Sequence, residues 1–154
     1  MIEIKAIENI EQKTNITLEI MNALPEWFSP PEDIRKKSIF HQKLPFWAVF
    51  DNNLPIGFIT LKIHNLYTLE IYNLGILKKY HRQGLGRQLI NVVSQYGVNN
   101  GFKFLTVKTL DSSAIYPPYD ATRAFYSAEN FFPLEVFLTY WNIENPCLFL
   151  IKLL

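Results

Sequence analysis

One continuous segment, residues 73–93 (NLGILKKYHRQGLGRQLINVV), constrains the fold more than any other part of the chain. It opens with strand-forming residues, passes through a basic turn with two glycines, and ends in a helix. Leu85, Leu89 and Val93 recur at the spacing of an amphipathic helix, and Asn100-Gly101 is a typical helix end. The segment therefore predicts a strand, a turn and a helix in immediate succession.

The turn of this segment has the features of an anion site. Gly84 and Gly86 allow the backbone to approach a ligand, because neither has a Cβ atom. The first turn of the following helix leaves N–H groups unpaired and adds the positive end of the helix dipole. Several donors in a row suit a pyrophosphate. The cations expected around this turn are Lys78, Lys79, Arg82 and Arg87.

The charge distribution agrees with a compact anionic ligand. The chain has a net charge of +1, yet no Asp or Glu occurs between Ile71 and Leu110, where six Lys and Arg residues lie. A local positive field in a mildly acidic protein favours a small anion over a long polyanion. A solvated basic face is the alternative interpretation. Nucleic-acid binding is a weaker one, because aromatic residues do not alternate with the basic ones as stacking platforms would.

Length and composition predict one soluble domain over residues 1–154. Hydrophobic residues make up 49% of the chain, which is enough for one sizeable core. The single cysteine, Cys147, excludes an internal disulfide, and the three histidines show no zinc-binding spacing, so no metal is expected. The N-terminus lacks a signal peptide, and no apolar run is long enough to span a membrane. We therefore expect a cytoplasmic protein without membrane contact.

The hydrophobic pattern predicts a mixed α/β domain in the order β-α-α-β-β-β-α-β-α-β-β. Ser29 is the expected cap of the second helix. The expected strands are 1–6, 46–50, 55–62, 69–77, 104–110, 134–138 and 147–153, and the expected helices are 7–23, 31–41, 85–100 and 122–129.

Two familiar phosphate-binding patterns do not fit the turn, because Leu89 replaces the third glycine of G-x-G-x-x-G and no Gly-Lys-Ser/Thr occurs. The pattern R/Q-x-x-G-x-G/A followed by a helix matches with one departure, because His81 stands at the Arg/Gln position and is followed by Arg82 and Gln83. At this point the sequence resembles the GNAT-type N-acetyltransferase superfamily. The resemblance implies a mostly antiparallel sheet of about six to seven strands with a splayed central pair, the acyl-CoA N-acyltransferase fold.

The resemblance also implies where acetyl-coenzyme A binds. The pantetheine arm would lie along the end of the central strand, and the pyrophosphate would lie on the turn. The residues implied are Leu74, Gly75 and Ile76 on the strand, and His81, Arg82, Gln83, Gly84, Leu85, Gly86 and Arg87 on the turn.

Downstream, TRAFYSAENF at 122–131 resembles the family's helix that ends in F-Y-x-x-x-G-F. Asn130 replaces the glycine, and Asn also accepts the left-handed C-cap conformation. Tyr119 stands where the family usually has Asn. The resemblance makes Tyr126 the candidate acid that protonates the departing thiolate; the alternative is a packing tyrosine with a wet hydroxyl.

Glu70 is the candidate general base, with His64 as the runner-up. A solvated glutamate at a strand end and a histidine at a hairpin end are the alternatives. The expected oxyanion donor is a backbone N–H of residues 74–76, and Gly75 could equally mark a bulge. Cys147 is a poor candidate nucleophile in its apolar setting.

The acceptor site is less constrained. Family architecture points to Trp27, Phe28 and Arg35, together with Tyr67 and the loop at 116–119. Aromatic residues suit an apolar or cationic amine, although Trp27 and Phe28 could serve only the core. No motif selects among a small amine, an amino acid derivative, an aminoglycoside-like compound and a peptide N-terminus.

Taken together, these features predict an acetyl-coenzyme A-dependent N-acetyltransferase that acts on a primary amine of a small molecule or peptide. Direct attack in a ternary complex is expected, because no activated nucleophile is evident. The alternative is a regulatory module that binds coenzyme A or acyl-coenzyme A without turnover. The apolar C-terminal strand CLFLIKLL could form the edge of a homodimer or an ordinary core strand.

Overall fold

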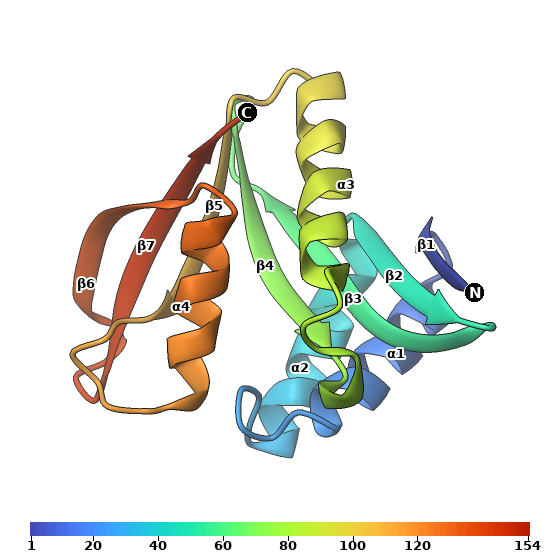
Figure 1. Cartoon of the computed structure of the whole chain (residues 1–154), viewed down its shortest axis with the longest axis horizontal. Helices are drawn as coiled ribbons and strands as arrows, with labels where there is room; N and C mark the ends of the chain where they lie inside the picture. The colour runs from blue at the N-terminus through green and yellow to red at the C-terminus, as the bar shows by residue number, and fades with distance from the viewer. The chain divides into compact units, whose positions relative to one another are not determined.

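The computed structural model describes all 154 residues and confirms the predicted order of strands and helices (Figure 1). Its seven strands form one mixed, mostly antiparallel sheet in the order β1-β2-β3-β4-β5-β7-β6. The elements are β1 (Ile2–Ala6), α1 (Ile10–Asn22), α2 (Pro31–Phe40), the 3-10 helix η1 (His41–Lys43), β2 (Phe46–Asp51), β3 (Leu54–Ile63), β4 (Thr68–Ile76), the 3-10 helix η2 (Lys78–Tyr80), α3 (Leu85–Asn99), β5 (Phe104–Leu110), α4 (Pro118–Ala128), β6 (Phe132–Asn142) and β7 (Asn145–Leu153).

One predicted helix cap and one predicted helix start were wrong, both beside prolines, whereas the predicted start of α2 at residue 31 is confirmed. The cap of α2 is Pro30 rather than Ser29, and it makes no side-chain cap hydrogen bond. Helix α4 begins at Pro118, four residues before the predicted start at Thr122. Proline is favoured in the first turn of a helix, where its missing N–H would have no partner. Pro118 therefore starts α4 within a segment that the sequence analysis did not assign to a helix.

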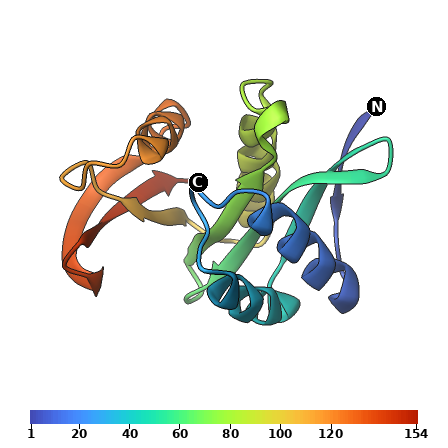
Figure 2. The same cartoon turned by 90° about the horizontal axis from the view of Figure 1, so that it is seen from below.

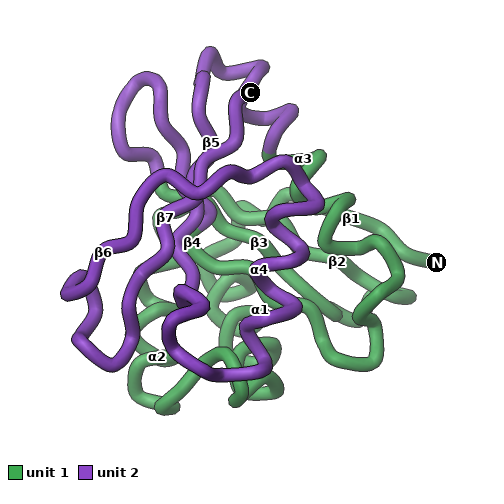
Figure 3. Tube along the Cα trace, turned by 60° about the vertical axis from the view of Figure 1, so that its left-hand side comes forward, with its two compact units in different colours: residues 1–62, 72–93 green, residues 63–71, 94–154 purple.

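The chain forms two compact units (Figure 3). Unit 1 comprises residues 1–62 and 72–93, and unit 2 comprises residues 63–71 and 94–154. Strand β4 and helix α3 each contribute residues to both units. That residues 1–154 act as a single N-acetyltransferase domain stays a prediction.

Unit 1 packs helices on both faces of its strands. Figure 2 shows α1 and α2 on one face of β2 and β3, with the start of α3 on the other. Strand β2 is accordingly buried along Phe46–Phe50, which explains its uninterrupted apolar sequence. The turn after it is made by Asn52 and Asn53, both at positive φ (48° and 72°), as a tight hairpin requires.

Unit 2 places β7 between two neighbours. β4 pairs in parallel with β5 through Thr68–Ile71 and Phe104–Val107, and β7 pairs antiparallel with both β5 and β6. β7, which contains CLFLIKL, is therefore an interior strand, and β6 is the edge strand next to it. No helix of the structure is long and apolar enough to cross a bilayer.

A fully buried histidine ties the helices of unit 1 to β4. The Nδ1 atom of His41 accepts a hydrogen bond from the Thr17 hydroxyl (2.9 Å), and its Nε2–H donates to Oδ1 of Asn73 (2.8 Å). Burial lowers the pKa of His41 to about 4, with the Lys37 ammonium acting in the same direction and the Asn73 hydrogen bond opposing both. His41 is therefore a neutral structural residue at neutral pH.

This shift predicts acid sensitivity. The pKa of His41 falls from its ordinary 6.5 to about 4 on folding, so between these pH values the unfolded chain binds the extra proton. Stability should fall as the pH drops, and the unfolding free energy should be lower at pH 5 than at pH 7 by about 2 kcal/mol from this group. Urea unfolding of the wild type and of His41→Gln at both pH values measures the effect. An equal pH difference in both proteins would contradict this assignment.

Candidate functional site

The glycine turn, residues 81–86, follows η2 and includes the first two residues of α3, in unit 1. Two of its residues, Arg82 and Gly84, lie in the left-handed region, with φ of 62° and 79°. A Cβ atom built on Gly84 would meet no other atom of the chain within 4 Å. The hydrogen-bond ladder of α3 begins where the N–H of Gln88 donates to the Gly84 carbonyl (3.1 Å). The backbone of Gly84 thus borders open space just before the positive end of the helix dipole.

Side chains of the turn fold back and hold its shape. The Nε2–H of His81 donates to the carbonyl of Ile76 (2.6 Å), and the amide of Gln83 donates to the carbonyl of Lys79 (3.2 Å). The His81 ring also meets Trp27 edge-on, with 5.9 Å between the ring centroids. These side chains bind the chain itself, so the backbone remains the part of the turn suited to an anion. His81, which stands where the family has Arg or Gln, therefore stabilises the conformation of the turn through its hydrogen bond to Ile76.

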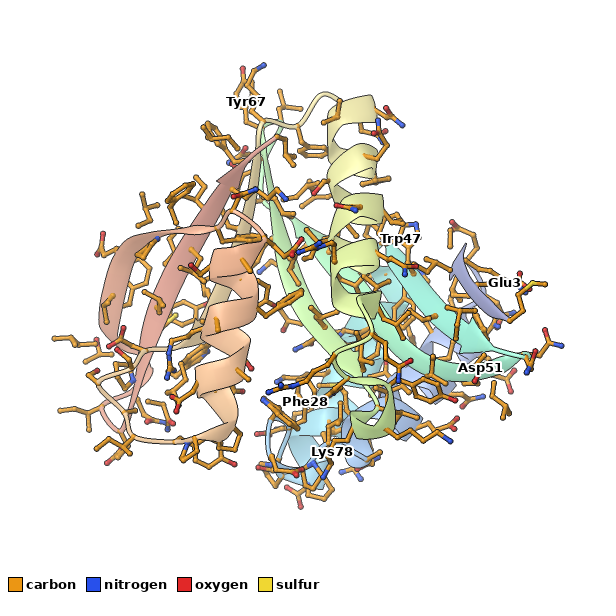
Figure 4. The ribbon with its side chains drawn as sticks, in the orientation of Figure 1. Glu3, Phe28, Trp47, Asp51, Tyr67 and Lys78 are labelled. Atoms are coloured by element: carbon orange, nitrogen blue, oxygen red, sulfur yellow. The ribbon has the colours of Figure 1, made fainter.

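Lys78 and Lys79, two of the cations predicted around the turn, contact residues of unit 1. The Lys78 ammonium forms an ion pair with Glu26 (2.5 Å), a residue of the connection between α1 and α2. Figure 4 shows Lys78 near Phe28, which belongs to the same connection. This pair lowers the pKa of the Glu26 carboxyl. The Lys79 ammonium lies 5.2 Å from the centroid of the Tyr80 ring. The Lys78 ammonium is thus paired with a carboxylate of unit 1, and the contribution of these cations to anion binding at the turn stays a prediction.

The end of β4 is shaped by close packing. A Cβ on Gly75 would lie 3.2 Å from Ile20 and 3.3 Å from Leu24, and one on Gly57 would lie 2.9 Å from the Gly75 carbonyl. Gly75 therefore lets α1 and the residues after it pack against β4, which explains this glycine without a bulge or a ligand. Leu74 and Ile76, on either side, are half-buried. Their predicted contacts with the pantetheine arm stay predictions.

Glu70 lies in unit 2 at the centre of a three-residue polar cluster. Its Oε1 accepts a hydrogen bond from Nε2 of His64 (2.6 Å), and its Oε2 forms an ion pair with the Lys108 ammonium (2.9 Å). Glu70 is 6% exposed, whereas the His64 side chain is 34% exposed. Glu70 is therefore not the solvated strand-end glutamate of the alternative interpretation. Both of its oxygens are occupied, and His64 is the member of the cluster that reaches solvent.

The geometry assigns the proton on His64. A carboxylate paired with lysine can only accept hydrogen bonds, so Nε2 of His64 carries the hydrogen. In the neutral ring, Nδ1 is then left with a lone pair. The turn before Glu70 holds His64 in place, because the His64 N–H donates to the carbonyl of Thr68 (3.0 Å). Asn65 caps the same turn by accepting from the N–H groups of Tyr67 and Thr68.

Tyr126 lies on α4 of unit 2 among other aromatic rings. Its ring meets those of Phe125 and Phe131 edge-on, with centroids 5.1 and 5.3 Å away, and the residue is 5% exposed. Burial raises the pKa of the Tyr126 hydroxyl well above its usual range, and Tyr119 adds to this shift. The hydroxyl therefore stays protonated at neutral pH. Asn130 ends this region at φ 67°, as its glycine-like position predicted.

The sequence model described as the Acetyltransferase (GNAT) family matches residues 5–131, which is most of the chain. The chain belongs to the GNAT family. Among curated proteins, none matches its sequence significantly.

Solved structures of GNAT proteins share the fold. A protein from Desulfovibrio desulfuricans, described as an acetyltransferase of the GNAT family, superposes with a TM-score of 0.84 at 16% identity over 99% of both chains. A GNAT acetyltransferase from Elizabethkingia anophelis with acetyl-CoA bound gives 0.72 at 19% identity, over 99% of this chain and 98% of the other. The aminoglycoside 6'-N-acetyltransferase from Enterococcus faecium gives 0.76 at 14% identity, over 98% and 96%. These likenesses show that the chain has the GNAT fold.

The predicted acceptor residues are distributed over both units. In unit 1, Trp27 and Phe28 are half-buried against the core, which agrees with the alternative that they serve the core. Arg35 is exposed on α2. In unit 2, Tyr67 is 55% exposed in the turn between β3 and β4, and its carbonyl accepts from the N–H groups of Lys103 and Phe104 (2.8 and 3.0 Å). Acceptor binding by these four residues stays a prediction.

Cys147 has no activating environment. The residue is fully buried in β7, and burial raises the pKa of its thiol to about 11. Lys108 lies close enough to favour the thiolate, a neighbour that the sequence did not reveal, but desolvation outweighs it. A thiol that stays protonated is a poor nucleophile, which agrees with the sequence-based judgement.

The cluster contains Glu70 and Lys108, whose contact the sequence analysis did not predict. Glu70 pairs with Thr106 across the parallel ladder, and Lys108 lies two residues further along β5 on the same face. Lys108 was visible in the sequence as a lysine in a strand of alternating polar and apolar residues. Its contact with Glu70 could not be predicted, because it depends on the pairing of β4 with β5, which only the fold supplies.

Proposed function

We propose that this chain is an acetyl-coenzyme A-dependent N-acetyltransferase that transfers the acetyl group to a primary amine. Membership of the GNAT family supports the reaction class, and the glycine turn carries the proposal for the coenzyme. The left-handed Gly84 borders open space at the start of α3, which suits a diphosphate held by backbone N–H groups. The co-substrate supplies the thioester and the chain supplies donors and acceptors of protons.

The reaction needs a donor for the leaving group. The amine nitrogen attacks the thioester carbonyl carbon, the C–S bond breaks, and the thiolate takes up a proton. Tyr126 is the proposed donor, because its buried hydroxyl remains protonated and matches the tyrosine of the family motif. Direct attack is favoured over an acyl-enzyme, since the Cys147 thiol is buried and protonated.

The reaction also needs an acceptor for the amine proton. We propose that this proton leaves through His64, directly or through water, and that Glu70 acts by orienting and stabilising the imidazole. Glu70 itself is a poor direct acceptor, because protonating it would break its ion pair with Lys108. The two candidate bases, Glu70 and His64, thus act together as one hydrogen-bonded pair.

His64→Asn should lower turnover by about 100-fold, the lower end of the range for a general base. Glu70→Gln should lower it less, because its amide oxygen still accepts the Nε2–H of His64. Turnover of both variants measured with and without added imidazole separates the roles, since imidazole in solution should restore turnover in His64→Asn and not in Glu70→Gln. If imidazole does not raise the turnover of His64→Asn, His64 is not the acceptor.

Isothermal titration with acetyl-coenzyme A and with coenzyme A, at two salt concentrations, tests the proposed function. Saturable binding followed by thiol release with an amine supports the enzyme. The amines to screen are simple amines, amino acid derivatives, aminoglycosides and peptides with free N-termini. Binding without turnover on any amine would favour the regulatory module, and no binding of either ligand would overturn both.

A further inference from the structure

Lys108 is the member of the cluster around Glu70 to which the proposed reaction assigns no task. Its ammonium lies 2.9 Å from Oε2 of Glu70, and its side chain is only 14% exposed. The two residues come from neighbouring strands, β5 and β4, and with His64 they all belong to unit 2. A lysine enclosed to this degree needs a partner for its charge, and the Glu70 carboxylate is that partner.

Two aromatic rings also contact the Lys108 ammonium. It lies 5.1 Å from the centroid of the Tyr140 ring on β6 and 5.4 Å from that of the Phe149 ring on β7. Phe149 is the residue directly opposite Lys108 in the pairing of β5 with β7, so both side chains lie on the same face of the sheet. The face of an aromatic ring attracts a cation, and more strongly where water is excluded. The ammonium is therefore held by a carboxylate oxygen and by two rings.

An anchor on one oxygen of a carboxylate also orients the other oxygen. With Oε2 of Glu70 held by Lys108, Oε1 lies 2.6 Å from Nε2 of His64. The backbone N–H of His64 is bonded to the Thr68 carbonyl, but its ring is hydrogen-bonded only to Glu70. The direction of the imidazole ring thus depends on the carboxylate of Glu70, and the direction of that carboxylate depends on Lys108.

We propose that Lys108 is a positioning residue of the acetyl transfer, which acts on His64 through Glu70. It fixes the plane of the carboxylate. A carboxylate paired with lysine can only accept hydrogen bonds, so the hydrogen of the neutral His64 ring stays on Nε2 and Nδ1 keeps its lone pair. This inference rests on the proposed function, in which His64 takes up the proton of the amine.

The alternative is that Lys108 serves only to join β4 to β5. These strands are already joined by the parallel pairing of residues 68–71 with residues 104–107. The Thr106 hydroxyl adds a hydrogen bond to the Leu69 carbonyl (3.1 Å). Removing the ammonium should therefore leave the two strands paired, and its effect should fall on the carboxylate of Glu70.

Proton NMR of the imidazole rings tests the positioning without any substrate. His64→Asn identifies the ring N–H signal of His64, and the buried ring of His41, bonded to Asn73 in unit 1, is the internal reference. The His64 signal should be present in the wild type and in Lys108→Arg, because a fixed carboxylate protects its N–H from exchange. In Lys108→Met it should be lost while the His41 signal remains. A His64 signal that persists unchanged in folded Lys108→Met would overturn the proposal.

A double-mutant cycle tests whether Lys108 acts through His64. Turnover is thiol release from acetyl-coenzyme A with whichever of the simple amines, amino acid derivatives, aminoglycosides and peptides the wild type acetylates fastest. Lys108→Met should lower kcat by about 10-fold at an unchanged KM for acetyl-coenzyme A, because it displaces only the proton acceptor. Lys108→Arg, which keeps the charge, should restore most of this loss.

His64→Asn/Lys108→Met should turn over as fast as His64→Asn alone, because a residue that acts through another has no effect once the other is absent. A structural role would instead lower turnover in both backgrounds. Losses that multiply in the double variant would therefore overturn the proposal.

Lys152→Met is the matched control. Lys152 lies opposite Leu105 in the pairing of β7 with β5, and therefore on the other face of the sheet from Lys108. Its ammonium also lies near an aromatic ring, 5.8 Å from the centroid of Phe131. Lys152→Met should keep the turnover of the wild type and its His64 signal.

A second variant covers the case in which Lys108→Met does not fold because Glu70 is left as a buried, unpaired charge. Glu70→Gln/Lys108→Met removes both charges. It should turn over as fast as Glu70→Gln alone, and a further loss would overturn the proposal. Failure of the proposed function is a separate result: the wild type would then release no thiol with any amine, while the NMR signals of the unliganded protein would still decide whether Lys108 positions His64.

Discussion

Gly84→Val should weaken acetyl-coenzyme A binding by about 100-fold or more. Each loss of about 1.4 kcal/mol in binding free energy raises the Kd tenfold. Gly84 adopts φ 79°, a region that a β-branched residue enters only with strain. Its missing Cβ also borders open space beside the amides at the start of α3. A valine would alter the turn and occupy that space, so both effects act against a diphosphate. Titration calorimetry measures the change.

The chain supplies a matched control for this substitution. Gly101 has nearly the same conformation, at φ 82°, and a Cβ built there also meets nothing within 4 Å. It lies after the end of α3, in unit 2, and outside the glycine turn. Gly101→Val should therefore lose comparable stability but keep its affinity for the coenzyme. If both variants bind as tightly as the wild type, the assignment of the glycine turn to the coenzyme is wrong.

Tyr126→Phe should lower kcat by at least about 100-fold while the affinity for acetyl-coenzyme A stays nearly unchanged. The phenyl ring keeps the contacts with Phe125 and Phe131, so α4 should pack as before. What is lost is the hydroxyl that burial keeps protonated. Steady-state rates of thiol release, combined with binding measured by titration, separate the two quantities.

Tyr96→Phe controls for the general effect of removing a tyrosine hydroxyl, because Tyr96 lies on α3 and has no proposed role in proton transfer. It should retain turnover close to that of the wild type. Turnover of Tyr126→Phe equal to that of Tyr96→Phe would leave Tyr126 as a packing residue. In that case the thiolate would have to be protonated by another group or by water.

Local features of the sequence were enough to predict the order of the elements. The spacing of Leu85, Leu89 and Val93 marked α3, and Gly101 marked its end with the left-handed conformation that glycine favours. The same reasoning placed β5 at Phe104–Leu110 without error. These signals are short-range, because periodicity and capping depend on residues within a few positions of one another. Membership of the family could also be predicted, since its motif is contiguous.

Contacts between distant segments could not be predicted from the same signals. The parallel pairing of β4 with β5 brings Lys108 to Glu70, 38 positions away in the chain. The hydrogen bond from His81 to the Ile76 carbonyl and the ion pair of Lys78 with Glu26 also join residues whose contact the sequence did not predict. None of these partners follows from local spacing.

The sequence by itself determined the succession of strands and helices, the glycine turn and the family. Only the tertiary structure decided that Glu70 is buried between two partners, that His41 is neutral, and that β6 is an edge strand while β7 is an interior one. The physical reason is that burial and partner choice depend on which strands pair, and a strand's pattern of residues does not state its neighbour. Charge and exposure follow from that pairing.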